Sequence, residues 1–286
     1  MSISKENIVA DLRKLGVAEG DHLNVKVSLK AIGFIEGGAG TVIEALLEAV
    51  GNEGTIFTDA FVPSFPLPLS EEDKKKVSRQ DSVSYAGALA NAVVKHPQSH
   101  RSPHPIQKFA GIGALAEELT QGHRAESPAY DLLAKLAEKG GKNLKIGEDV
   151  KVPGVGTTHV AIEQLGLKRK RRNSGVMYEK GDGSVDFFEL FWAGGCSHAW
   201  LKFYPEYERI GAILGQGQVG NAPCKLTDMK KTLEWELETI PKDLKVLLCE
   251  RSYCRTCSFE WSFATRGYLR WAVASLLQRS RSRKKP

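Results

Sequence analysis

The alternation of apolar and polar residues predicts helices and strands that interleave along the whole chain. Residues 5–15 carry apolar side chains at helical spacing and end at Gly16, whereas residues 22–27 alternate as a half-buried strand does. The same patterns predict further helices over residues 42–50, 86–94, 112–119, 128–139, 158–165 and 227–240, and further strands over residues 55–58, 143–146, 185–191 and 245–248. We therefore predict an α/β fold, a single compact mixed-sheet domain with helices packed around it.

Composition narrows the class of protein. The chain has 286 residues, of which 42% are hydrophobic and 26% charged, so it can bury one large core and is neither disordered nor fibrous. No apolar run reaches the roughly 20 residues of a membrane helix, and the charged start argues against a signal peptide. We expect a cytoplasmic protein whose five cysteines are reduced thiols.

The net charge of +6 is concentrated in two segments. Residues 168–172 are five consecutive cations, and residues 261–286 contain no acid, so both are candidate contacts for phosphates or anionic surfaces. In a helical tail an apolar stripe would form from Leu269, Val273, Leu276 and Leu277, beside Tyr268 and Trp271. We divide the chain into a main domain, 1–265, and a basic amphipathic extension, 266–286. The extension is expected to lie on an anionic inner membrane surface, to pack on the main domain, to form a homodimer contact or to be a solvated end.

A glycine-rich segment follows the first predicted strand. It contains Gly33, Gly37, Gly38 and Gly40, a spacing that matches neither the dinucleotide-binding fingerprint nor the phosphate-binding loop. The segment therefore does not indicate a nicotinamide-dependent oxidoreductase or an ATP-binding enzyme. The backbone N–H groups could face an anion beside the next helix, and a tight structural turn is an equally good interpretation.

Two histidines are candidates for chemistry. His159 lies near the start of a predicted helix with Glu163 four residues later, so a carboxylate on the same face could orient an imidazole general base. His104 is held between two prolines. The alternatives are an ordinary helix pair on the surface for His159 and a packed loop histidine for His104.

The cysteines raise the question of a metal. Cys249, Cys254 and Cys257 lie close together in sequence, and Cys196 or Cys224 could add a fourth thiolate. Structural zinc sites usually have two close pairs of ligands, and only one is present here. We therefore expect no metal, with a structural zinc site as the alternative.

Several segments together resemble the aminoglycoside 3-N-acetyltransferase family. They are Val27–Gly33, Glu36–Gly38, Val50–Thr55, Arg101–Pro105, Ser127–Pro128 and Thr157–His159 with Glu163. Their order and spacing run through residues 4 to about 249. The resemblance implies an acetyl-CoA-dependent enzyme unrelated in fold to the GNAT acetyltransferases. Family members act on aminoglycosides or on nucleotide-linked amino sugars of surface glycans.

The resemblance also implies roles for individual residues. It makes His159 the general base and Glu163 its orienting carboxylate, although the family spacing between them is usually three residues and is four here. It assigns the CoA and acyl pocket to Ser28, Leu29, Lys30, Arg101, Ser102 and His104. To this pocket we add Gly33, Gly37 and Gly38, whose backbone N–H groups could hold the oxyanion. The acceptor would contact Thr157, Thr158, Arg169 and Arg171.

The expected reaction is direct transfer of an acyl group from acetyl-CoA or another acyl-CoA to the amine of a small-molecule amino sugar, with no acyl-enzyme. Acidic residues in the loop between Thr58 and Ser84 are offset by lysines and an arginine, and the cations at 168–172 could pair with a diphosphate. We therefore favour a nucleotide-linked amino sugar. An aminoglycoside antibiotic is the alternative. A non-enzymatic basic module is a second alternative, but the chain has no nucleic-acid motif and we expect no nucleic-acid partner.

Overall fold

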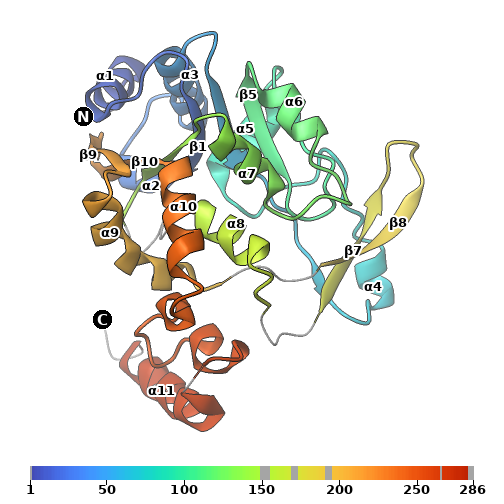
Figure 1. Cartoon of the computed structure of the whole chain (residues 1–286). Coiled ribbons are helices and arrows are strands. Elements are labelled where there is room, and N and C mark those ends of the chain that lie inside the picture. Colours follow the sequence, from blue (N-terminus) through green and yellow to red (C-terminus); the bar gives the residue numbers. More distant parts are fainter. Residues whose placement is uncertain (1, 149–154, 169–172, 191–194, 265, 283–286) are drawn as a thin grey trace.

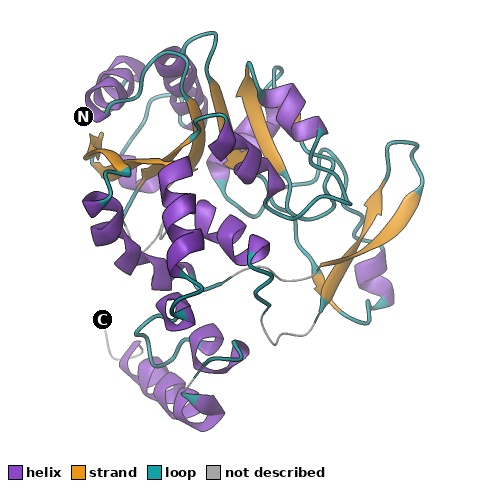
Figure 2. Cartoon of the chain, in the orientation of Figure 1, coloured by secondary structure: helices purple, strands orange, loops and turns teal. Residues whose placement is uncertain are grey.

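A seven-stranded mixed sheet forms the centre of the computed structural model (Figures 1 and 2). The structure describes residues 2–148, 155–168, 173–190, 195–264 and 266–282. In spatial order the strands are β4 (His100–Arg101), β5 (Phe109–Gly113), β2 (Thr55–Asp59), β1 (His22–Val27), β6 (Lys142–Ile146), β10 (Ala222–Asp228) and β9 (Ile213–Val219). β1 pairs in parallel with β2 and β6, and the other neighbours are antiparallel. The predicted α/β class is confirmed.

Three helices cover one face of this sheet: α1 (Lys5–Leu15), α3 (Ala39–Val50) and α5 (Ala88–Lys95). Their apolar stripes pack on the strands in one continuous core, because residues at helical spacing such as Leu12 and Leu46 all point to the sheet. α1 also packs against β9, and the Asp11 carboxylate accepts a hydrogen bond of 2.8 Å from the Gly220 N–H in the turn after β9. The N-terminal helix therefore contacts a turn that lies about 200 residues later in the sequence.

The opposite face carries α7 (Asp131–Glu138), α8 (Thr157–Gln164) and α10 (Met229–Thr239), while α6 (Ala116–Gln121) packs against β4 and β5. Leu132, Val160 and Met229 belong to a second core there. This face also buries polar groups, including an Asn24 to Asn143 side-chain hydrogen bond of 2.8 Å between β1 and β6. The candidate pair His159 and Glu163 lies on this more polar face, on α8.

The remaining elements lie at the periphery of the sheet (Figure 1). A small sheet of β3 (Phe65–Pro66), β7 (Ser174–Glu179) and β8 (Val185–Leu190) stands to one side with α4 (Glu71–Lys74). Short helices complete the fold: α2 (Leu29–Ile32), η1 (Ser197–Phe203), α9 (Tyr204–Arg209), η2 (Leu244–Leu247) and η3 (Thr256–Glu260). The C-terminal helix α11 (Gly267–Ser282) lies at the lower end in Figure 1. No helix within the described ranges is long and apolar enough to cross a membrane.

Two of the predicted elements are wrong. Residues 112–119 were expected to be helical, but Ile112 and Gly113 are the last residues of strand β5, which pairs with β2, and the helix begins only at Ala116. Residues 245–248 were expected to be a strand and instead overlap the 3₁₀ helix η2, which Asp243 caps by accepting the Lys245 N–H. Both are short apolar runs, whose period does not separate helix from strand.

Candidate active site

Strand β1 lies at the centre of the sheet, and later strands are added first on one side of it and then on the other. From β1 the chain passes to β2 on one side and later to β6 on the other, and open α/β sheets bind ligands at the carboxyl ends of strands at such points. Ser28 follows β1, is half-buried, and donates its backbone N–H to the Ile146 carbonyl at 2.8 Å. Lys30 is exposed. The structure therefore leaves this predicted donor segment at an accessible edge.

His159 is the third residue of α8, on the polar face of the sheet. The helix can start close to strand β1 and helix α7 because residue 156 is glycine. A Cβ there would lie 3.0 Å from the Asn24 amide of β1 and 2.7 Å from the Leu133 side chain of α7. The His159 ring stacks on Tyr130, with centroids 4.4 Å apart and planes 8° apart, and its edge meets Trp200 at 4.7 Å. The imidazole is half-buried. Two rings thus fix its plane while part of it stays accessible.

Glu163 does not have the partner expected from the sequence. Its two carboxylate oxygens accept the backbone N–H groups of Ala129 at 2.8 Å and Tyr130 at 3.0 Å, so the side chain caps the start of α7. Burial raises the pKa of this carboxyl group, and the two N–H bonds oppose the rise. We correct the assignment: Glu163 holds the Tyr130 turn, and Tyr130 in turn stacks on His159.

Thr157 and Thr158 lie on the covered side of α8. Both are fully buried, and their contact with the acceptor stays a prediction. The Thr157 hydroxyl lies 3.1 Å from the Thr232 hydroxyl, and the Thr158 hydroxyl donates to Glu236 at 2.5 Å. Their hydroxyls attach α8 to α10, because buried hydroxyl groups must find partners.

Glu236 is a buried carboxyl group that sequence reasoning missed. It is 0% exposed, and it accepts the Tyr207 hydroxyl as well as that of Thr158. Burial raises its pKa to about 7, against the opposing effect of these hydrogen bonds. The signal was available, since Glu236 shares helical spacing with the buried Met229 and Thr232.

The guanidinium group of Arg101 is mainly engaged in hydrogen bonds to backbone carbonyl groups. It donates to the carbonyl oxygens of Gln80, Ser82 and Ala60 at 2.6–2.7 Å. Desolvation lowers its pKa to about 10. The side chain also borders a surface hollow of about 840 Å³ between β4 and α6. Arg101 therefore positions the 80–82 loop, and its role in holding the acyl donor stays a prediction.

Ser102 and His104 are both buried, and their role in the acyl-donor pocket stays a prediction. The Ser102 hydroxyl accepts the Phe109 N–H at 2.9 Å. The His104 ring is 1% exposed, stacks on His123 at 4.7 Å, and accepts the N–H groups of Ile106 and Gln107 through Nδ1. Burial lowers its pKa to about 2, so it is neutral. His104 fits the alternative of a packed loop histidine.

The glycine-rich segment forms a tight turn. Gly33, Gly37 and Gly38 have φ values of 117°, 76° and 62°, which favour glycine. A Cβ at residue 33 would lie 2.7 Å from the Asn221 amide, and the Phe34 carbonyl accepts the Ile3 N–H at 2.8 Å. These contacts support the structural interpretation, and binding of the donor by these glycines stays a prediction.

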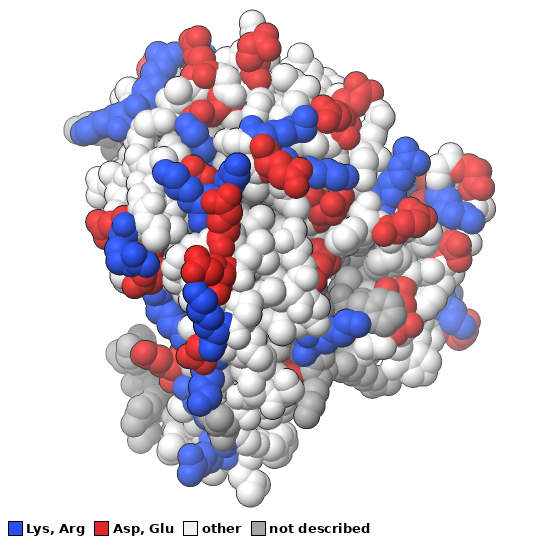
Figure 3. Space-filling model, viewed as in Figure 1, with Lys and Arg blue, Asp and Glu red and all other residues white. Residues whose placement is uncertain are grey.

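Charged groups in the loop between Thr58 and Ser84 are mixed in sign. Acids and lysines of α4 and the residues after it pair with one another at i,i+3: Glu71 with Lys74, Glu72 with Lys75 and Asp73 with Lys76. Figure 3 shows positive and negative side chains interspersed over one face of the molecule. Burial and the charges of Asp59 and Glu163 raise the pKa of Tyr130. The Asp59 carboxylate pairs with Lys26 at 3.2 Å, and Glu163 accepts two backbone N–H groups. Arg169 and Arg171 lie outside the described residues.

Three lysines line a narrow crevice next to the start of α8. Lys26, Lys145 and Lys225 come from the adjacent strands β1, β6 and β10, and Gly156 borders the same crevice. The Lys145 and Lys225 ammonium groups each lie 4.8 Å from the centre of the Tyr204 ring, and burial lowers the pKa of Lys145 to about 8. The sequence pattern could not predict this cluster, because the three lysines become neighbours only through the order of the strands in the sheet.

Comparison with known proteins points to one family. The family profile described as aminoglycoside 3-N-acetyltransferase matches residues 25–240. Aminoglycoside N(3)-acetyltransferase III of Serratia marcescens is 34% identical over 188 residues, which are 61% of this chain and 68% of that protein. A protein of the same name from Salmonella sp. is 32% identical over 268 residues, 84% of this chain and 92% of its own.

Solved structures agree with these relatives. The structure titled AAC-VIa bound to sisomicin has a TM-score of 0.72 and 25% identity, and covers 85% of this chain and 98% of its own. The structure titled AAC-IIIb binary with CoASH has the same score and identity, and covers 85% and 97%.

Proposed function

Because the chain belongs to the aminoglycoside 3-N-acetyltransferase family, we propose that it transfers an acetyl group from acetyl-CoA to an amine of an aminoglycoside. The enzyme class expected from the sequence, an acyl-CoA-dependent N-acyltransferase, is confirmed. The nucleotide-linked amino sugar favoured from the sequence is corrected, because the relatives are named as aminoglycoside enzymes.

The placement of His159 carries the proposal. An aminoglycoside amine is largely protonated at neutral pH and must lose a proton to attack a thioester, and a half-buried imidazole suits that task. His159 takes this proton as the new N–C bond forms. It returns a proton to the sulfur as the C–S bond breaks. Acetyl-CoA supplies the activated acetyl group.

Neighbouring residues position the base. Stacking on Tyr130 and edge contact with Trp200 restrict the His159 ring. Glu163 fixes the backbone of Tyr130, so it is a positioning residue that acts through that ring. Because the ring is already held in one orientation, less free energy is needed to order the base when the substrates bind.

We place the donor at the carboxyl end of β1, near Ser28 and Lys30. Lys145 and Lys225 lie on the neighbouring strands β6 and β10, and positive side chains suit the phosphates of CoA. Substitution of Ser28 by Ala or Lys30 by Ala should raise the KM for acetyl-CoA more than it lowers kcat. An unchanged KM in both variants would move the donor elsewhere.

Steady-state release of CoA thiol tests the reaction. The purified chain should acetylate aminoglycosides such as sisomicin and show no turnover with UDP- or dTDP-linked amino sugars. The reverse preference would refute the proposed acceptor. An acetyl group trapped on a protein side chain would refute direct transfer.

The C-terminal extension has a separate proposed role, contact with an anionic membrane surface. Leu269, Val273 and Leu276 of α11 are exposed. Trp271 is not free to enter headgroups as expected, because its indole N–H donates to the Tyr253 carbonyl at 2.9 Å. Deletion of residues 267–286, which leaves Arg266 and its bonds to the Cys249 and Arg251 carbonyls in place, should abolish co-sedimentation with phosphatidylserine vesicles and leave turnover intact. A change from dimer to monomer, or unfolding, would refute this role.

A further inference from the structure

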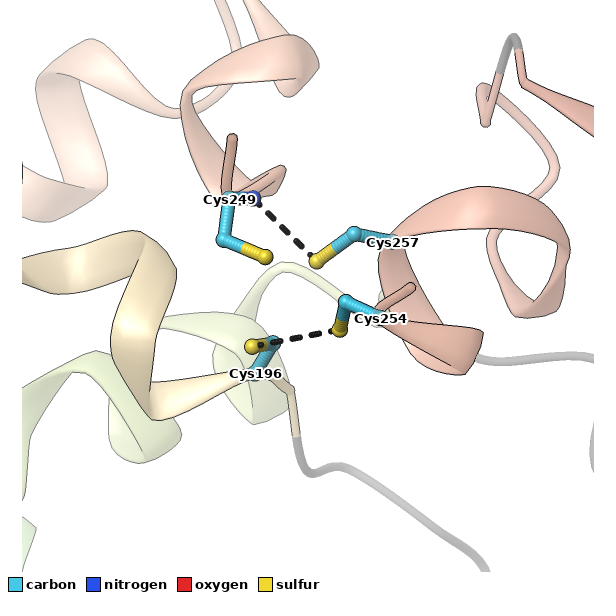
Figure 4. Close-up of side chains that lie close together, drawn as sticks. All are labelled: Cys196, Cys249, Cys254 and Cys257. Atoms are coloured by element: carbon cyan, nitrogen blue, oxygen red, sulfur yellow. Dashed lines mark hydrogen bonds between the residues drawn. The ribbon is translucent and has the colours of Figure 1, made fainter. Parts of the chain in front are cut away.

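Four cysteine side chains converge in the C-terminal part of the fold, outside the acetyl-transfer site (Figure 4). Cys196 precedes η1, Cys249 follows η2, and Cys254 and Cys257 lie at η3. Their sulfur atoms all lie within 4.8 Å of one another. Cys249 and Cys257 are buried, and the other two are half-buried. Two segments distant in sequence thus direct four thiols to one point.

The sulfur positions fit a single tetrahedral metal ion. Zn²⁺ binds thiolates at about 2.3 Å, which places tetrahedral ligands about 3.8 Å apart. The Cys196 and Cys254 sulfurs are 3.6 Å apart, and the whole cluster stays within 4.8 Å. All five cysteines of the chain are free thiols, and one disulfide would use only two of these four. Four thiolates around one ion favour zinc among the common metals.

The surroundings suit a charged site. Zn²⁺ with four thiolates has two net negative charges, which neighbouring donors and cations must offset. The Cys249 N–H donates to the Cys257 sulfur at 3.2 Å. Arg266 donates to the carbonyls of Cys249 and Arg251, so a guanidinium lies against the loop that carries the ligands. Such N–H and cation contacts are usual around metal thiolates.

We propose that Cys196, Cys249, Cys254 and Cys257 bind one structural Zn²⁺. Binding replaces four S–H protons by four Zn–S bonds and releases four protons, with no change of oxidation state. All four positions are filled by protein, which is the pattern of a structural and not a catalytic site. The proposal revises the sequence-based expectation of no metal. Sequence spacing could not single out Cys196 over Cys224.

The zinc ion would hold the C-terminal segment to the wall of the active site. Cys249 and Cys257 pack in one core with Trp200 and Trp261, and Trp200 contacts the His159 ring. Three of the four ligands lie beyond residues 25–240, the part that matches the family profile. The site therefore attaches a segment outside the matched region to the residues that position the base.

Metal analysis of the whole chain tests the proposal. Protein purified in reducing buffer without added zinc should contain about one zinc per chain by mass spectrometry of the elements. Cys254→Ser should lose the zinc. Cys224→Ala is the matched control, since Cys224 is a buried thiol of β10 outside the cluster, and it should retain zinc.

Two measurements on the wild type keep the test decisive if Cys254→Ser fails to fold. A mercurial reagent should release the zinc in step with modification of the thiols. Exchange with Co²⁺ should give the intense visible bands of a tetrahedral thiolate complex. Protein without stoichiometric metal, protein with iron in place of zinc, a Cys196–Cys254 disulfide in freshly reduced protein, or zinc retained by folded Cys254→Ser would each overturn the proposal.

Discussion

His104 and His159 both stack on an aromatic ring beside the same sheet, yet their surroundings differ in kind. His104 is almost wholly buried, and Nδ1 accepts two backbone N–H groups. Its pKa falls to about 2, so it cannot gain a proton at neutral pH. His159 is half-buried at a helix start, between Tyr130 and Trp200. A motif match alone gives both residues a functional role.

The difference shows what separates a structural from a reactive histidine. Burial and occupied lone pairs remove the proton chemistry of an imidazole, while restriction by packed rings does not. Orientation by stacking is common to both residues. Partial exposure belongs to His159 alone, and the tests below address that distinction.

Replacement of His159 should give the largest effect. His159→Ala removes the proposed base, and kcat should fall by roughly 100- to 10,000-fold. Steady-state kinetics at pH 7 measure this loss, and calorimetric titration with CoA should show unchanged binding. A fall of less than tenfold would mean that another group takes the amine proton.

The matching change at His104 should affect stability and leave chemistry intact. His104→Ala leaves two buried N–H groups without an acceptor and removes a stacked ring, so the free energy of unfolding should fall by about 3 kcal/mol. Urea denaturation measures it. At a temperature where the variant is folded, kcat should stay within about twofold of the wild-type value. A large fall in kcat with unchanged stability would show that His104 takes part in the reaction.

Glu236 extends the comparison to pH. Its pKa is raised from 4.5 to about 7, so the folded state binds its proton more tightly than the unfolded chain does. The resulting stabilisation is fully present below pH 4.5 and is lost as pH rises through about 7, and it amounts to about 3 kcal/mol. Glu236→Gln should abolish this part of the pH dependence in urea unfolding from pH 4.5 to 8. An unaltered slope would show that Glu236 titrates normally.

Glu163 should give the smallest effect, through positioning. Glu163→Gln keeps one acceptor oxygen but turns an amide N–H₂ toward a backbone N–H, which costs about 1 kcal/mol in one hydrogen bond. We expect kcat to fall about fivefold to tenfold, with the KM for acetyl-CoA unchanged. Tyr130→Leu should give the same kinetic pattern if Glu163 acts through that ring. A large loss from Glu163→Gln alone would indicate direct contact with the reacting groups.

Regular elements were the most predictable part of the fold. The pattern around Leu12 located α1, and alternation at Leu23 and Val25 located β1, because these residues obey the helix and strand periods. The apolar runs at 112 and 245 failed since they are too short to show a period. The order of strands follows from long-range pairing, such as Cys224 with Ile146, that no local pattern contains.

The candidate site was predictable in part. His159 could be proposed from its motif, but Tyr130 and Trp200 meet it only in the folded chain. Thr158 was placed on the substrate because sequence shows which residues are adjacent, and not which side of a helix is covered. Its partner Glu236 is 78 residues away.

The contact between α1 and the turn after β9 has a consequence for synthesis on the ribosome. Asp11 and Gly220 are 209 residues apart, and the face of α1 that packs against β9 has no cover until that strand is made. At about 5–20 residues per second, the interval lasts roughly 10–40 s. During that time the apolar face of the nascent N-terminal helix is exposed to aggregation. A chain released before residue 220 cannot complete the fold.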